Sequence, residues 1–317
     1  MSKIISKKVF VRLVVGLALV TNLAFTVLVA GSNVLSGSTV IAQNVLTGDW
    51  TASLGKDNSS KIHLNFERRS EKGNKNQMGQ SYDFADLQGL SREQALSGGP
   101  VKFSLVREAG TIDCEGTFQD GKGSGTFRFT GNQSFVSAMK SRGFDFDEAS
   151  IARDGRHSEE DRLFAATTLN VTTALADDLS SAGFGKLGVD DLFKAAIFKV
   201  DSKFMREMKA SGFPNLGMED LVKARIFKID ADFVSQVTQM GFDKEPFESL
   251  VKMRIFKITP EYITEVRNEG LTNIAVEDIV KLRIFKIDSQ FIRAAKADGV
   301  PLEVERLVQR RIGVGHK

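Results

Sequence analysis

The chain has 317 residues, enough for two domains, and its 42% hydrophobic and 26% charged residues are typical of a soluble globular protein. Its net charge of +3 comes from the N-terminus, where four basic residues and no acidic residue precede Asp49. Without those four, 39 of the 43 Lys and Arg residues remain, against 40 Asp and Glu. This balance argues against nucleic-acid binding, which needs clustered uncompensated positive charge.

Residues 1–42 have the pattern of a targeting segment. A basic stretch from Lys3 to Arg12 precedes an apolar run from Leu13 to Ala30, and Val40-Ile41-Ala42 follows as a small-residue cleavage site. The pattern predicts a bacterial-type signal peptide. The apolar run of about 18 residues is also just long enough to span a bilayer, so an uncleaved inner-membrane anchor is the alternative. In both cases the body is exported, to the periplasm, the cell surface or the medium.

Residues 48–130 are predicted to form an antiparallel β domain of about six strands. Apolar and polar residues alternate, as in the segment from Ile62 to Phe66, which is the period of a half-buried strand. Ser91 and Gln94 have the spacing of a capping box that opens one short helix. The single cysteine, Cys114, alternates with apolar neighbours and is expected to be a small buried hydrophobe.

The first strand contains Gly48-Asp49-Trp50, which resembles the Gly-x-Trp signature of lipocalin-type barrels. The resemblance implies a cavity for a small apolar ligand. It covers only three residues, and six strands are fewer than the eight that such a barrel needs. The alternative is that Trp50 fills one end of a small core.

The C-terminal half repeats itself every 29 residues. Ile-Phe-Lys recurs at Ile197-Phe198-Lys199, Ile226-Phe227-Lys228, Ile255-Phe256-Lys257 and Ile284-Phe285-Lys286. Glycines keep the same step at Gly183, Gly212, Gly241, Gly270 and Gly299. Residues 132–317 therefore form six units, starting near residues 132, 172, 201, 230, 259 and 288. The first unit carries an 11-residue insertion near Asp154–Glu160. Such periodicity predicts a helical solenoid, and the whole chain an α+β fold.

Each unit is predicted to consist of two short helices, A and B. Helix A begins after a capping side chain and ends at a left-handed glycine such as Gly212. The expected caps are Asp201, Asp230, Thr259 and Asp288. Helix B is expected to turn five apolar residues inward. In the unit that starts near residue 201, these are Leu221, Val222, Ile226, Phe227 and Ile229.

Basic residues also recur in helix B. Lys194, Lys223, Lys252 and Lys281 each follow an acidic residue by four positions, which predicts ion pairs within the helix. Two further sets lack such an acid: Arg225, Arg254 and Arg283, and Lys199, Lys228, Lys257 and Lys286. They are either structural or form a basic ridge that binds an acidic protein or an anionic envelope polymer.

The repeats resemble helical repeats attached to some bacterial membrane metallopeptidases of the penicillin-sensor type. The resemblance rests on units such as the segment from Gly212 to Phe233 and covers roughly residues 172–300. It implies an interaction region outside the cytoplasm. It implies no peptidase, because the chain lacks His-Glu-x-x-His and its three histidines are scattered.

No motif for catalysis, a metal or a cofactor is found in the sequence. The composition and repeats favour a non-enzymatic exported interaction or scaffold protein. Two alternatives stay open: a small-ligand carrier that uses the β domain, and a hydrolase of envelope polymers that uses two carboxylates. Membrane association is expected only if residues 1–42 remain attached.

Overall fold

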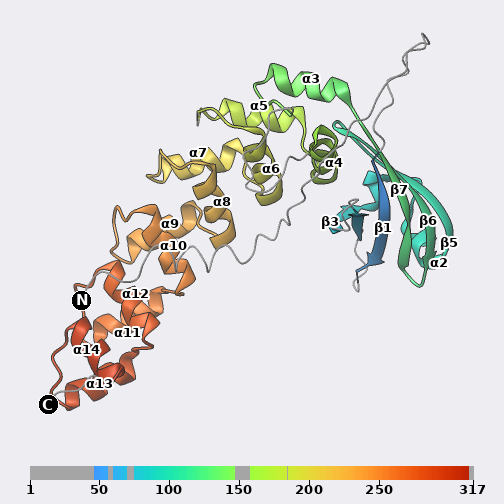
Figure 1. The fold of residues 1–317 in the computed structure, drawn as a ribbon. Coiled ribbons are helices and arrows are strands. Elements are labelled where there is room, and N and C mark those ends of the chain that lie inside the picture. Colours follow the sequence, from blue (N-terminus) through green and yellow to red (C-terminus); the bar gives the residue numbers. More distant parts are fainter. Residues whose placement is uncertain (1–45, 56–59, 70–74, 147–157, 184, 314–317) are drawn as a thin grey trace, which may run out of the picture. The chain divides into compact units, whose positions relative to one another are not determined.

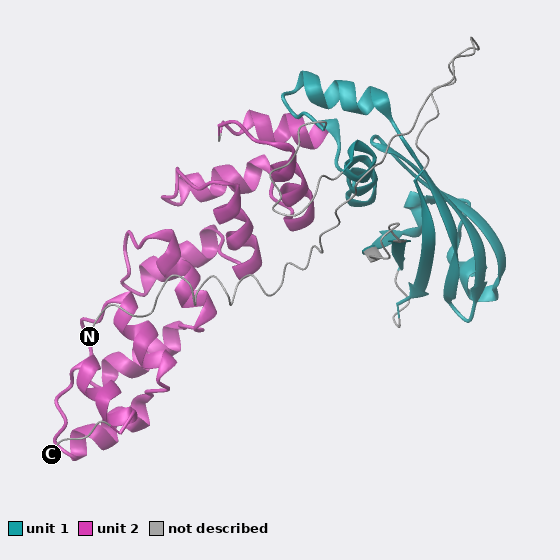
Figure 2. Cartoon of the chain, in the orientation of Figure 1, with its two compact units in different colours: residues 1–173 teal, residues 174–317 magenta. Residues whose placement is uncertain are grey.

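The structure is a computed structural model that describes residues 46–55, 60–69, 75–146, 158–183 and 185–313. It confirms the predicted α+β class and divides into compact units of residues 1–173 and 174–317 (Figures 1 and 2). The predicted targeting segment and most of the predicted insertion lie outside the described residues. Within the described ranges, no helix is both long and apolar enough to cross a membrane.

The first compact unit contains a seven-stranded antiparallel sheet with the order β3-β2-β1-β7-β6-β5-β4. The strands are β1 (Leu46–Leu54), β2 (Lys61–Arg69), β3 (Lys75–Asp83), β4 (Leu87–Gln88), β5 (Gly99–Arg107), β6 (Gly110–Gln119) and β7 (Lys122–Gly131). A short 3-10 turn η2 (Phe84–Asp86) and helix α2 (Arg92–Ser97) lie between them. The predicted capping box of α2 is confirmed, because Ser91 and Gln94 exchange reciprocal hydrogen bonds.

Trp50 lies at the centre of the sheet core and is only 1% exposed. The centroid of its ring lies 5.1 Å from that of the Phe103 ring and 5.7 Å from that of the Phe118 ring. Its Nε1 donates a hydrogen bond to the Glu115 carbonyl at 3.2 Å. Gly116 makes room for the indole, since a Cβ there would approach Trp50 to 2.7 Å. The tryptophan therefore fills a packed core. Cys114 is also buried, and burial raises the pKa of its thiol, so the thiol stays neutral.

One helix pair belongs to the same compact unit as the sheet: α3 (Gln133–Ser141) and α4 (Glu159–Leu169), of which α4 packs on the strands. Phe164 of α4 contacts the rings of Phe66, Phe127 and Phe129 at centroid distances of 5.3 to 5.9 Å. This aromatic cluster buries one face of α4 on the sheet. The two helices lie at the front of the predicted repeat series.

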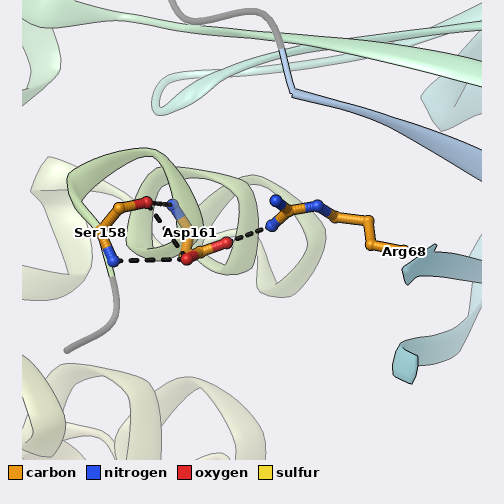
Figure 3. A network of polar contacts seen from close by, with 3 residues as sticks. All are labelled: Arg68, Ser158 and Asp161. Atoms are coloured by element: carbon orange, nitrogen blue, oxygen red, sulfur yellow. Dashed lines mark hydrogen bonds and ion pairs between the residues drawn. The ribbon is translucent and has the colours of Figure 1, made fainter. Parts of the chain in front are cut away.

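Side chains of strands β2 and β3 hold both ends of α4. At its start, Ser158 and Asp161 form a capping box, and Arg68 of β2 pairs with the free oxygen of Asp161 (Figure 3). At its end, the Thr168 carbonyl accepts hydrogen bonds from Gln80 and Tyr82 of β3. The carbonyls of a last helical turn lack partners within the helix, so these contacts fix α4 on the sheet by its polar ends as well as by its aromatic face.

The second compact unit consists of five further helix pairs. They are α5 (Thr173–Ser181) with α6 (Val189–Phe198), α7 (Ser202–Ala210) with α8 (Met218–Phe227), α9 (Ala231–Gln239) with α10 (Phe247–Ile255), α11 (Pro260–Asn268) with α12 (Val276–Ile284), and α13 (Ser289–Ala297) with α14 (Val304–Arg311). Consecutive B helices from α6 to α14 pack on one another. All four predicted caps of the A helices are confirmed, each accepting from the amide three residues later. The predicted glycines adopt positive φ, as at Gly212 (φ 98°).

One expectation about helix B is wrong. Leu221, Val222 and Ile229 are buried as expected, but Ile226 is 43% exposed and Phe227 is half-buried. Successive residues of a helix are rotated by about 100°. Ile226 therefore lies nearly opposite the buried pair Leu221 and Ala224, and Phe227 lies at the flank of that face.

Three A helices contribute a buried ring at the same position of each unit. Phe204, Phe233 and Tyr262 occupy equivalent positions one repeat apart and are 3–4% exposed. Each is the residue whose amide bonds the capping side chain, so the cap also fixes where the ring enters the core.

Two alanine substitutions distinguish these roles. We expect Phe233→Ala to reduce the free energy of unfolding by about 3–5 kcal/mol, because it removes a buried ring. Phe227→Ala should cost only about 1–2 kcal/mol, because part of that ring is already in water. Urea unfolding of the full chain, followed by far-ultraviolet circular dichroism, measures both. Equal losses in the two variants would contradict this assignment of the core.

Candidate interaction surface

The Ile-Phe-Lys motif, the most regular feature of the sequence, ends at the protein surface. Three of its isoleucines are strongly exposed: Ile197 (50%), Ile226 (43%) and Ile284 (42%). The fourth, Ile255, and all four phenylalanines are half-buried, whereas all four lysines are exposed. Because consecutive B helices pack together, their C-terminal ends follow one another along the array. We name the four motifs together the Ile-Phe-Lys stripe: residues 197–199, 226–228, 255–257 and 284–286.

The lysines of the stripe adopt the left-handed backbone conformation. Their φ values are 57° at Lys199, 54° at Lys228, 52° at Lys257 and 52° at Lys286. Each lysine follows the end of a B helix and lets the chain turn toward the next A helix. Glycine and asparagine are the residues that adopt this conformation routinely. The equivalent turn is made by Asn170 after α4 and by Gly313 after α14.

These four lysines make no ion pair with any residue in the described ranges, and the structure therefore leaves their ammonium groups exposed to solvent. The other recurrent lysines behave differently. Lys194 pairs with Glu219 at 2.5 Å and Lys223 with Glu248 at 2.7 Å, each across to the next B helix. Lys252 with Glu277 and Lys281 with Glu305 continue the series. The hydrogen bond from Lys281 to Glu305 raises the pKa of this lysine.

The expected pairing of these lysines within their own helix is therefore corrected. Three of the acids four positions earlier, Glu219, Glu248 and Glu277, instead bind the lysine of the preceding B helix. Three of the lysines also lie near an aspartate three positions earlier, for example Asp220 and Lys223 at 3.2 Å. Packing of neighbouring B helices brings the glutamate of one close to the lysine of the other, so this charge pattern links successive units.

The arginines of the hypothetical ridge are committed to contacts inside the array. The guanidinium of Arg225 lies 3.8 Å from the centroid of the Phe204 ring, and that of Arg254 lies 3.7 Å from that of Phe233. Arg283 lies 4.5 Å above the Tyr262 ring. A cation over an aromatic face is attracted by the ring quadrupole, so each arginine covers the core ring of its own unit.

Two of these arginines also reach the preceding unit. Arg254 donates to the Lys228 carbonyl at 2.6 Å, and the Nε of Arg283 donates to the Phe256 carbonyl at 3.4 Å. In the last unit, Arg311 donates to the Phe285 carbonyl at 3.0 Å. These carbonyls lie at the C-terminal ends of B helices, which carry partial negative charge and lack partners within the helix.

A comparison of the units within the chain supports a structural role for the arginines. In the unit that starts near residue 172, the position equivalent to Phe204 is Leu175 and the position equivalent to Arg225 is Ala196. The arginine is thus absent where the ring is absent. The predicted ridge therefore divides into structural arginines and exposed lysines.

The β domain has a separate polar hollow of about 820 Å³ on the face of the sheet that carries polar side chains. Asp49, Asp113 and Glu115 line it, together with basic residues such as Arg128. Two of its acids are already engaged across strands, Asp113 with Ser104 at 2.6 Å and Glu115 with Lys102 at 2.8 Å. Among the described residues, no group of His, Cys, Asp and Glu is arranged to hold a metal.

The two kinds of basic residue can be told apart by their effects on stability. We expect Arg254→Ala to lower the free energy of unfolding by about 1–3 kcal/mol, because it removes a ring contact and a bond to a helix end. Lys228→Gly should leave it unchanged or raise it by up to about 1 kcal/mol, because glycine adopts positive φ without steric cost. Urea unfolding measures both. A large loss with Lys228→Gly would show that this lysine is structural.

Comparisons with protein-family models and with curated proteins found no match for this chain. The resemblance of the repeats to those of penicillin-sensor-type metallopeptidases therefore stays a prediction. The same holds for the lipocalin-like signature at Trp50.

Proposed function

We propose that this protein is a non-enzymatic, exported interaction protein that binds its partner along the Ile-Phe-Lys stripe. The observation that carries the proposal is the exposure of the motif. A residue that recurs at a fixed step in a repeat array usually serves the packing between units. Packing alone does not explain the isoleucines at residues 197, 226 and 284, because these residues are 42–50% exposed to solvent. Aligned exposed apolar groups are a property of interaction sites.

The proposed surface is supported by a rigid scaffold. Arginines and lysine–glutamate pairs connect successive B helices, so the ends of these helices are held in a fixed order. A partner that contacts several units at once binds more tightly than one that contacts a single unit. After the first contact has formed, each further contact forms within the same complex.

The β domain supports this function by covering the start of the repeat series. Terminal repeats need a polar or covered outer face, because they lack one neighbour. In the front pair of helices, α4 buries Phe164 on the sheet and is held there by Arg68. The alternative of a ligand carrier finds less support, because Trp50 is packed among Phe103 and Phe118. The polar hollow gives no specific support to a carboxylate hydrolase.

Site-specific photo-cross-linking tests the proposal. We would replace Ile226 by a photoreactive benzoylphenylalanine in the full chain and irradiate the cells that produce it. The control places the same residue at Gln236, an exposed position of helix α9. We expect a discrete cross-linked product at position 226, and none or a weaker one at position 236. Equal patterns at the two positions, or no product at 226, 197 and 284, would refute the proposal.

A further inference from the structure

We infer that the partner of the Ile-Phe-Lys stripe is a peptide segment rich in both carboxylates and aliphatic side chains. This inference rests on the proposed function and specifies the chemistry of the partner. It is carried by the four left-handed lysines, which the fold does not need in order to make its turns.

The backbone at these positions favours residues other than lysine. A side chain with a Cβ is disfavoured at positive φ, whereas glycine is not, and asparagine tolerates the conformation through local hydrogen bonds. The chain uses Asn170 and Gly313 at the first and last turns of the series, but lysine at all four turns between them. Backbone geometry therefore does not account for lysine at all four of these turns, and the exposed ammonium group is the property that the four residues share.

Those ammonium groups have no counterpart inside the described protein. Their neighbours on the B helices, Lys194 and Lys223, are neutralised by Glu219 and Glu248 of the following units. The four stripe lysines form no such pair within the described ranges and stand exposed at intervals of one repeat. Packed helices lie about 8–10 Å apart, so the array presents a row of positive charges at roughly that spacing. A row of carboxylates complements it.

The exposed isoleucines further restrict the chemical class of the partner. Ile226 lies two residues before Lys228, so this exposed ammonium group has an aliphatic side chain close to it along the chain, and the motif repeats the arrangement. A purely anionic polymer would neutralise the lysines and leave the isoleucines in water. A bilayer would require side chains that insert about 5–10 Å below the headgroups, but the phenylalanines are half-buried. A peptide with acidic and aliphatic side chains satisfies both groups at a shallow surface.

Selection from a random-peptide display library tests the inference with the full chain as bait. Four variants accompany the wild type. The first replaces all four stripe lysines by asparagine, which removes the charge but suits the left-handed turn, as at Asn170. The second replaces them by arginine, which keeps the charge. The third is Ile226→Ser with Ile284→Ser. The control is Lys209→Asn with Lys244→Asn, two exposed lysines outside the stripe, of which Lys244 is also left-handed (φ 57°).

We expect the selected peptides to be enriched in Asp and Glu together with Leu, Ile and Val. Fluorescence anisotropy of these peptides should show at least about tenfold weaker binding to the asparagine variant and to the serine variant. The arginine variant and the control should bind within about twofold of the wild type. Added salt should weaken wild-type binding, since exposed charges are screened. Circular dichroism of each variant checks that the fold is intact.

Several outcomes would overturn the inference. One is that no peptide is selected, or that the selected peptides lack acidic residues. Another is that the asparagine variant binds as well as the wild type. A third is that heparin, or vesicles of phosphatidylglycerol and phosphatidylcholine, bind through the lysines where peptides do not. A cross-linked partner at position 226 that is insensitive to the lysine exchanges would refute this inference and leave the proposed function intact.

Discussion

The second compact unit depends on one constraint: none of its described helices is longer than ten residues. Isolated helices shorter than about 12–15 residues are marginal in water, so contacts between helices must stabilise each of them. Each B helix is stabilised by packing on the next B helix along the chain. Polar contacts also join successive B helices, through arginine hydrogen bonds to carbonyls at helix ends and through lysine–glutamate pairs. Among the recurrent basic residues of the B helices and the turns after them, only the stripe lysines have no place in this scheme within the described ranges.

Most of the helical architecture could be predicted from the sequence, because it depends on local chemistry. Capping residues such as Asp230 and left-handed glycines such as Gly241 act within one turn of the chain, and the 29-residue step identifies them repeatedly. The expectation of burial at Ile226 and Phe227 failed because hydrophobicity alone does not determine which face of a helix a residue occupies. Rotation by about 100° per residue places Ile226 away from Leu221, so the sequence did contain the signal.

Other features depend on contacts between distant residues and had weaker signals. Strand β3 (Lys75–Asp83) was not predicted because few of its residues are apolar. Its Gln80 and Tyr82 instead bind the end of α4, a role that no alternation pattern reveals. The stacking of Arg254 on Phe233 joins residues 21 positions apart. The loss of ring and arginine together at Leu175 and Ala196 was a signal that a comparison of the units could have found.

Packing explains some of the residues that recur in the array and leaves others unexplained. Packing requires the caps, the glycines, the A-helix rings and the arginines, and it accounts for their recurrence. It does not require an exposed isoleucine, nor a lysine where Asn170 and Gly313 make the same turn. Each of these choices exposes apolar surface or places a side chain in a disfavoured left-handed backbone conformation. The lysine recurs at four consecutive turns and the strongly exposed isoleucine in three of the four units. Packing leaves this part of the regularity unexplained, and the proposed binding surface rests on it.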